Sequence, residues 1–230
     1  MPAPPALLHH LAQVPGMGPG RRRLVVLFSQ LGDFDSLEYA QALAATLPQL
    51  QEAGIALLAV GIGDDAGADR FCGFTGLPRE LLQVEGTPQL HQSLGLSEGL
   101  KAPGGPWPSL LLMCAGVGSP GTLAEVFRGY TGDRSAPQRL ASPLFNLAGG
   151  EGFQRPFELA TVRLRNMVEV LSHWRTYVPS DDYLTQRGGT FLLDRDDSLL
   201  YSYRDAGLLG FSATMARPLS FLDAYFGNDG

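Results

Sequence analysis

Residues 23–43, RLVVLFSQLGDFDSLEYAQAL, contain the junction that decides the fold. The run 23–28 begins with Arg23 and is otherwise apolar, which is the pattern of a strand covered on both faces. An acidic turn follows, and Leu37, Ala40 and Leu43 then recur at helical spacing. We therefore predict a buried strand that turns tightly into an amphipathic helix.

The turn of this junction holds Asp33, Asp35 and Ser36. Asp35 with Glu38 three residues later is close to a capping box, so we expect Asp35 to cap the helix. We expect Pro48 to kink or divide that helix. Many enzymes hold a reactive thiol at such a junction. The turn is therefore either a site that uses carboxylates or a thiol site that lacks its cysteine.

The rest of the chain continues the alternation of strands and helices. Apolar runs at 55–63 and 81–84 predict two more strands, with short helical segments after each, an order typical of parallel strands. Strands at 190–193 and 199–203, joined by an acidic turn, predict a β-hairpin. A last helix is expected at 212–226, interrupted by Pro218. The fold class is thus α/β, with a central sheet flanked by helices.

Between 97 and 185 the pattern breaks, which predicts a helical insertion before the hairpin. We expect a loop through the prolines at 103–108 and loop-rich chain at 132–152. We divide the chain into a flexible N-terminal arm (1–22), an α/β domain (23–96 and 186–230) and the insertion (97–185). The clearest helix, 157–174, has an apolar stripe that we expect to face the core. The alternative is a helix that docks an acidic partner or a membrane surface through Arg163 and Arg165.

The composition limits the class of partner and the compartment. The net charge is −6 and the pI about 5.2, which argues against nucleic acid as a partner. Cys72 and Cys114 are too few for a disulfide framework, so a reducing compartment is the simpler interpretation. We find neither a signal peptide nor an apolar run of about 18 residues. We expect a cytoplasmic protein that reaches membranes only through partners.

Two stretches resemble peroxiredoxin-like proteins of the AhpC/TSA superfamily. They are RFCGFTGLPRELLQVEGTPQLHQSLGL at 70–96 and QRGGTFLLDRDDSLLYSYRD at 186–205, and the resemblance extends over 23–96 and 186–207. It implies a thioredoxin-like fold. It also implies a thiolate at the start of the first long helix, with its pKa lowered by the helix N-terminus and an arginine, that attacks a peroxide.

The resemblance places the family's cysteine, or its Cys-x-x-Cys pair, at Asp33 and Ser36, and its arginine at Arg187. A carboxylate is a poor nucleophile toward peroxide, and a serine has no thiolate-like state. Asp33 is then either a turn residue or the partner of Arg187. The resemblance therefore implies a redox enzyme's fold used as a binding or scaffold module for an unidentified protein partner.

The rival interpretation is a thiol-dependent peroxidase or oxidoreductase that uses Cys72 or Cys114. A lone cysteine on a helix is more often a small apolar residue in the core, and a redox pair with Cys114 would require the insertion to fold back on the sheet. A third interpretation is nucleotide binding at 116–121, where GVGSPG matches G-x-G-x-x-G. Its late position and Pro120 favour a plain turn, and we expect no cofactor.

We expect no metal site. Acidic residues gather at 181–182 and 194–197, but their spacing matches no calcium loop. The histidines lack metal-ligand spacing beyond one adjacent pair; they are His9, His10, His91 and His173.

Overall fold

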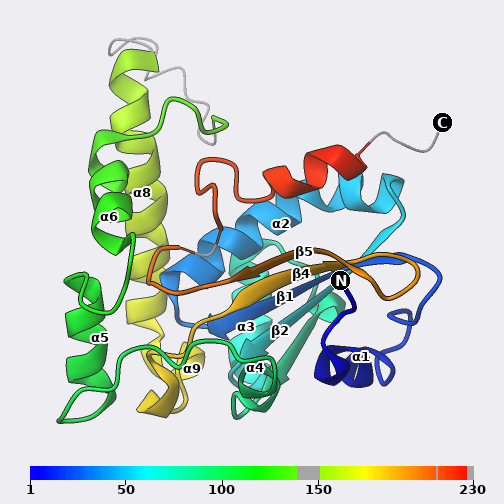
Figure 1. Cartoon of the computed structure of the whole chain (residues 1–230). Coiled ribbons are helices and arrows are strands. Elements are labelled where there is room, and N and C mark those ends of the chain that lie inside the picture. Colours follow the sequence, from blue (N-terminus) through cyan, green and yellow to red (C-terminus); the bar gives the residue numbers. More distant parts are fainter. Residues whose placement is uncertain (139–150, 211, 227–230) are drawn as a thin grey trace.

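The computed structural model describes residues 1–138, 151–210 and 212–226 (Figure 1). These residues form a five-stranded mixed sheet in the order β3-β2-β1-β4-β5. The strands β1, β2 and β3 run parallel, and β4 pairs antiparallel with both β1 and β5. Their bounds are β1 (Arg22–Gln30), β2 (Ile55–Ile62), β3 (Leu82–Glu85), β4 (Gly189–Leu193) and β5 (Leu199–Arg204). The predicted α/β class with a flanked central sheet is confirmed.

Helices cover both faces of the sheet because alternate side chains of its central strands point to opposite sides. On one face, Leu24, Val26 and Phe28 pack with α2 (Phe34–Glu52) and α3 (Asp65–Thr75). On the other, Val25 and Leu27 pack with α1 (Pro5–Leu11) and α4 (Gln89–Ser93). The wholly apolar run in β1 thus reflects burial on both sides.

The N-terminal segment, which we expected to be a flexible arm, contains a helix that packs on the sheet. Its helix α1 buries Leu7 and Leu11, and Met17 is also buried in the same core cluster. The prolines and glycines there shape the turns between α1 and β1, while three apolar side chains hold the segment against the sheet.

The helix α2 corrects two expectations. Its N-cap is Asp33, whose backbone is extended, and Asp35 lies inside the first turn, where it is buried. Pro48 does not divide the helix, which continues to Glu52. Leu43 and Leu50 are buried on either side of the proline, so packing on the sheet outweighs the hydrogen bond that a proline cannot donate.

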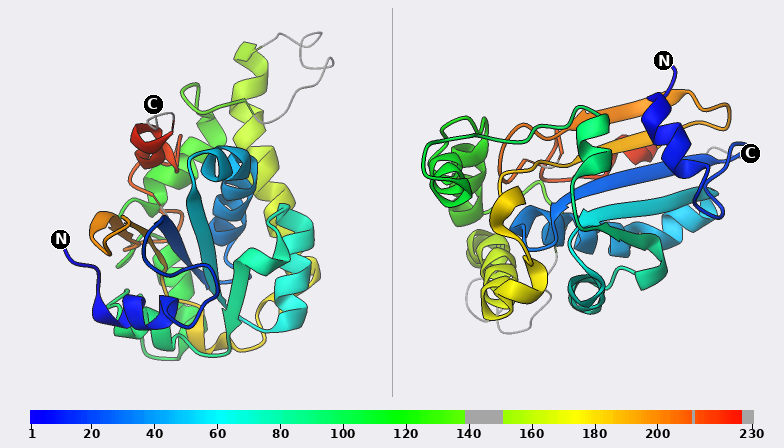
Figure 2. Two further views of the ribbon diagram at one scale, coloured as in Figure 1. Left: turned by 90° about the vertical axis from the view of Figure 1, so that its right-hand side faces the viewer. Right: turned by 90° about the horizontal axis from the view of Figure 1, so that it is seen from below.

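The insertion is helical and stands at one end of the sheet (Figures 1 and 2). It contains α5 (Pro106–Cys114), α6 (Thr122–Thr131), α8 (Glu151–Ser172) and α9 (Trp174–Tyr177). The prediction of a loop at 103–108 is wrong from Pro106 onward, because α5 begins there. Proline is favoured in the first turn of a helix. Of the loop expected at 132–152, residues 139–150 lie outside the described residues.

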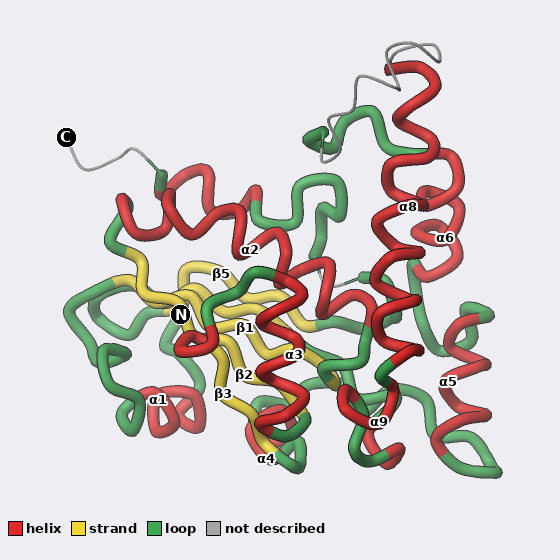
Figure 3. Tube along the Cα trace, turned by 180° about the vertical axis from the view of Figure 1, so that it is seen from behind, coloured by secondary structure: helices red, strands yellow, loops and turns green. Residues whose placement is uncertain are grey.

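The apolar stripe of α8 faces solvent rather than the core, contrary to our expectation. Leu164, Val168 and Leu171 are 55%, 54% and 58% exposed, while Asn166 and Val170 point inward. The helix contacts α2 and α6 through polar groups, including a hydrogen bond from Gln41 to Asn166, and it buries Val170 in the core. Figure 3 shows α8 standing clear of the sheet on its outer side.

The C-terminal residues do not form the helix that we predicted at 212–226. Turns occupy most of 212–219, and only the short 3₁₀ helix η3 (Ser220–Tyr225) follows Pro218. Two other short 3₁₀ helices, η1 (Arg79–Leu81) and η2 (Asp181–Tyr183), end connections elsewhere.

Candidate functional site

The turn between β1 and α2 holds a buried cluster of one arginine and several aspartates. Nη2 of Arg187 lies 3.1 Å from Oδ2 of Asp33 and 3.5 Å from Oδ2 of Asp35. Asp33 is therefore an ion-pair partner at the N-cap position of α2, where its side chain makes no capping hydrogen bond. The structure brings together the aspartates and the arginine that the sequence analysis singled out.

Strand pairing explains why a residue so distant in sequence reaches this turn. Arg187 directly precedes β4, whose Gly189 pairs with Leu27 near the end of β1. Gly188 permits this close approach, because a Cβ there would collide with the carbonyl oxygen of Leu27. The backbone N–H of Arg187 donates to the carbonyl oxygen of Ser97, which fixes the arginine from the other side.

Burial controls the charges of the cluster. Arg187 and Asp35 are 1% and 2% exposed. Burial raises the pKa of Asp35 well above its usual value, and the charge of Asp33 raises it further, while Arg187 opposes the shift. Burial likewise raises the pKa of Asp205 to about 7, again opposed by Arg187. The carboxyls of Asp35 and Asp205 therefore keep their protons up to pH values at which exposed aspartates have already released theirs.

The cluster has almost no space for a ligand. A cavity of about 10 Å³ lies beside Asp33, Asp35 and Asp205, which is room for about one water molecule. Ser36 is buried there, and the hydroxyl of Tyr39 lies 2.9 Å from that of Thr190 across the same cavity. The arrangement can hold a charge pair and shared protons, but it offers no room for a substrate.

Two free thiols lie at different depths. Cys72 is buried on α3, and burial raises its pKa to about 11 despite the opposing charge of Arg79. Cys114 is exposed at the end of α5. No disulfide joins them, so the redox pair that we considered is not formed in this structure.

The insertion brings Cys114 toward the acidic cluster, which the sequence analysis missed. Burial of its sulfur raises the pKa of Cys114, and the nearby carboxylates of Asp33 and Asp35 raise it further, while Arg187 opposes them. No sequence pattern signals this proximity, because it depends on how α5 docks against the end of the sheet.

The comparisons with known proteins identify the family. The family model described as "AhpC/TSA antioxidant enzyme" matches residues 42–207. The chain belongs to this family. No curated protein and no solved structure matches it.

The matched range contains Cys72, Cys114 and Arg187 but begins after Asp33, Asp35 and Ser36. The equivalence of this turn to the family's thiol site therefore stays a prediction. The thioredoxin-like fold expected from the resemblance fits both the family and the flanked five-stranded sheet described above. Within the described residues, no helix combines the length and the apolar character needed to cross a membrane.

The glycine-rich segment 116–121 is a turn between two helices of the insertion, not a strand-to-helix junction. Gly116, Gly118 and Gly121 all have positive φ. Ser119 accepts a hydrogen bond from the backbone N–H of Leu208, and Thr122 donates one to the carbonyl oxygen of Leu208. These polar groups hold the turn against the chain after β5, so the strand context that a dinucleotide site requires is missing here.

The acidic hairpin and the histidines have structural partners. Asp194 and Asp197 form ion pairs with Arg22 and Arg23. His91 is buried, and its Nε2 lies 2.6 Å from the carbonyl oxygen of Phe28, while burial lowers its pKa to about 4. In the part of the chain that the structure describes, no group of three or more metal-ligating side chains gathers.

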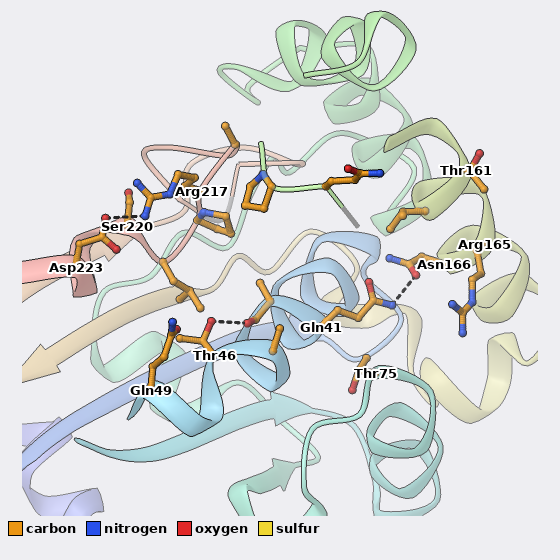
Figure 4. Close-up of a pocket in the computed structure, with 18 of the residues that line it drawn as sticks. Gln41, Thr46, Gln49, Thr75, Thr161, Arg165, Asn166, Arg217, Ser220 and Asp223 are labelled. Carbon is orange, nitrogen blue, oxygen red and sulfur yellow. Dashed lines mark hydrogen bonds and ion pairs between the residues drawn. The ribbon is translucent and has the colours of Figure 1, made fainter. Parts of the chain in front are cut away.

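A groove of about 650 Å³ lies elsewhere, between α2, α8 and the C-terminal residues (Figure 4). Gln41 donates a hydrogen bond of 2.9 Å to Asn166 at one end, and Arg217 pairs with Asp223 at 2.8 Å at the other. The described lining includes neither cysteine nor Arg187. The sequence analysis missed this groove because its walls come from segments far apart in the chain.

Proposed function

We propose that this AhpC/TSA-family protein acts as a binding or scaffold module for a protein partner rather than as a peroxidase. The observation that carries the proposal is the ion pair of Arg187 with Asp33 and Asp35. It occupies the turn where the resemblance places a thiolate. In the proposal, Asp33 and Ser36 stand where the family's cysteines would be, and the acidic net charge and the reducing compartment favour a protein partner in the cytoplasm.

The contacts of Arg187, the small cavity beside it and the pKa values of the thiols support this proposal. A peroxidase arginine must stabilise a thiolate and the leaving oxygen, whereas Nη2 of Arg187 already contacts Asp33 and Asp35. The cavity beside it holds about 10 Å³, which is room for about one water molecule. Both native thiols have raised pKa values, which lowers the thiolate fraction at neutral pH.

The test is a peroxide-consumption assay with hydrogen peroxide and dithiothreitol. We expect the wild-type protein to consume peroxide no faster than the Cys72→Ala/Cys114→Ala variant. Turnover that depends on either cysteine would contradict the scaffold proposal.

The second candidate is a thiol peroxidase that uses Cys114. Its support is the exposure of Cys114 together with the charge of Arg187, which opposes the rise in the pKa of this thiol. In that reaction the thiolate attacks one peroxide oxygen, the O–O bond breaks, and sulfenic acid and hydroxide form. A dithiol reductant returns the sulfenic acid to the thiol and releases water.

Trapping with a sulfenic-acid reagent and mass spectrometry separates the two candidates. Stoichiometric labelling of Cys114 within seconds of peroxide addition would favour the peroxidase. Labelling over hours, at the rate of an ordinary exposed thiol, would favour the scaffold. Cys72→Ala is the matched control, because Cys72 is the buried thiol of the same chain.

A further inference from the structure

We propose that the outer surface of the insertion is the interface through which two copies of this chain associate. We call this surface the insertion face. Its centre consists of two rows of exposed apolar side chains: Leu123, Phe127 and Tyr130 on α6, and Leu164, Val168 and Leu171 on α8. The inference goes beyond the proposed function, because it holds whether or not the acidic cluster is inert.

Exposed apolar side chains are concentrated on this one part of the protein. Among the residues that the structure describes, every large hydrophobic side chain classed as exposed lies between Trp107 and Leu171, apart from Met1. Phe127 and Tyr130 are 68% and 75% exposed. A soluble monomer seldom exposes such a contiguous apolar surface, and a larger patch marks an interaction site.

The two rows lie on neighbouring antiparallel helices. Arg163 on α8 hydrogen-bonds to the backbone carbonyl oxygen of Glu125 on α6 at 2.6 Å, and Gly132 beyond the end of α6 approaches Arg155. In Figures 1 and 2, both helices stand side by side at the end of the sheet, with α5 continuing the row below α6. The insertion thus presents several adjacent helices at the end of the sheet rather than one exposed helix.

The spacing on α8 suits pairing with another helix. The exposed positions Phe157, Thr161, Leu164, Val168 and Leu171 alternate steps of four and three residues. This is the seam spacing of helices that pack along their length. The row on α6 repeats the same steps at Leu123, Phe127 and Tyr130.

The charged side chains of α6 and α8 are largely paired within the molecule, which leaves the insertion face nearly neutral. Glu125, Glu158 and Glu169 are all paired with arginines of the same molecule. In 106–131 and 154–172, Arg165 is the one charged residue classed as exposed. A neutral face can meet its own copy without like-charge repulsion, although the chain carries a net charge of −6.

This charge pattern also argues against a lipid surface as the occupant. A helix that lies on a membrane carries lysines and arginines along the margins of its apolar face, where they meet anionic lipids. The insertion face offers Arg165, and the guanidinium of that residue lies 5.0 Å from the ring of Phe74 rather than projecting freely.

The exposed area matches what a stable dimer requires. Phe127, Tyr130 and Phe157 expose 68%, 75% and 51% of their surface, which is roughly 300–500 Å² at about 150–250 Å² per aromatic side chain. Five aliphatic side chains that are half or more exposed add to this: Leu111, Leu123, Leu164, Val168 and Leu171. The sum approaches the roughly 800 Å² that each partner contributes to a standard interface.

A two-fold axis would place the seam of one α8 against that of its copy, flanked by the two α6 helices. Such an interface is isologous, so the same surface of each copy meets the other. The test is sedimentation equilibrium on the full chain between 1 and 100 μM, together with a Leu164→Glu/Val168→Glu variant. In that variant, each copy would bring two negative charges into a desolvated seam when the dimer forms. The wild-type seam carries neither charge.

We expect the wild-type protein to sediment at twice its 24.6 kDa mass and the variant at the monomer mass. A Gln51→Glu/Gln92→Glu variant adds the same charge at exposed sites outside the insertion face and should remain dimeric. Thermal melting checks that each variant is folded, and a Phe127→Glu variant on α6 provides a second disruption of the insertion face.

Two results would overturn the inference. The first is a wild-type monomer at 100 μM, whether or not the protein floats with vesicles of phosphatidylcholine and phosphatidylglycerol. The second is a dimer that survives both the α8 and the α6 substitutions. Neither readout depends on peroxide turnover, so the failure of this inference is distinguishable from the failure of the proposed function.

Discussion

At the residue scale, burial favours the protonated forms of Asp35 and Asp205. Both carboxyls are at most 5% exposed, and each has an Oδ1 without a hydrogen-bond partner among the described residues. Arg187, which faces them, likewise leaves Nε and Nη1 unpartnered. One arginine cannot neutralise Asp33, Asp35 and Asp205 at once, so protonation of a carboxyl relieves the excess negative charge.

This cluster predicts an unusual pH dependence of stability. The pKa of Asp205 is about 7 in the folded protein against 3.8 as its ordinary value. Between these values the folded state holds a proton that the unfolded chain releases, so stability from this group falls as the pH rises from about 4 to about 7. The decrease is on the order of a few kcal/mol, since one pKa unit corresponds to about 1.4 kcal/mol.

Urea unfolding of the wild type and of Asp205→Asn across this pH range checks the sign. The variant should lose less stability than the wild type as the pH rises. His91 acts in the opposite direction, because its pKa of about 4 costs stability as the pH falls below 6.5, but its contribution is common to both proteins and cancels. Parallel pH profiles would show that Asp205 titrates as an ordinary aspartate.

A second prediction at this scale concerns Asp33→Cys in a Cys72→Ala/Cys114→Ala background. Its sulfur would stand at the N-terminus of α2 beside Arg187, and both features stabilise a thiolate. We expect a thiol pKa below the usual 8.5, measured from the pH dependence of the iodoacetamide reaction. Adding Arg187→Gln should raise it again. A pKa at or above 8.5 would mean that Asp35 and burial outweigh the arginine.

The prediction at the element scale compares the effects of alanine substitutions at two glycines, Gly188 and Gly73, on stability. Gly188→Ala would drive a methyl group into the backbone of Leu27 where β4 begins beside β1, and backbone there has nowhere to move. Gly73→Ala adds its methyl on the exposed side of α3, with nothing within 4 Å. Denaturant unfolding should show a loss of about 3 kcal/mol or more for the first and a gain of about 0.5–1 kcal/mol for the second. Equal effects would contradict the close approach at Gly188.

The strands were predictable as elements because burial on both faces leaves uninterrupted apolar runs in β1 and β2. The start of α2 was not, since Asp33 and Asp35 lie two residues apart and an aspartate at either position suits an N-cap. The pairing with Arg187 could be predicted only as one of two roles for Asp33. The position of Cys114 depends on tertiary docking, which leaves no local pattern.

The prediction that the apolar stripe of α8 faces the core was wrong for a different physical reason. Helical periodicity shows that Leu164, Val168 and Leu171 share a face, but it does not show which face meets the core. Here the inward face carries Asn166 and Glu169, which bind Gln41 and Arg70, beside the buried Val170. The opposite, apolar side of α8 is left exposed, which is what the insertion face proposal explains.

At the scale of the whole molecule, Arg163 is one of the residues that join the insertion to the α/β core. Arg163 on α8 lies 3.3 Å from Oε2 of Glu38 on α2, and its Nη2 lies 3.2 Å from Oε2 of Glu125 on α6. Glu38 is 2% exposed, so this ion pair is largely withdrawn from water. Removing one member of such a buried pair is costly because the other charge keeps its desolvation penalty.

The Arg163→Met variant should therefore loosen the insertion before it unfolds the sheet. We expect a loss of about 3 kcal/mol, near the lower end for breaking a buried pair, because Arg128 also lies within electrostatic reach of Glu38. Limited proteolysis should cut within 106–172 well before the strands, since regions of low local stability open first. Arg165→Met is the matched control, because that guanidinium stacks over Phe74 and its loss should leave the cleavage rate near that of the wild type. If both variants are cleaved at the same rate, the insertion is held by its apolar and amide contacts with α2, and Arg163 contributes little to its docking.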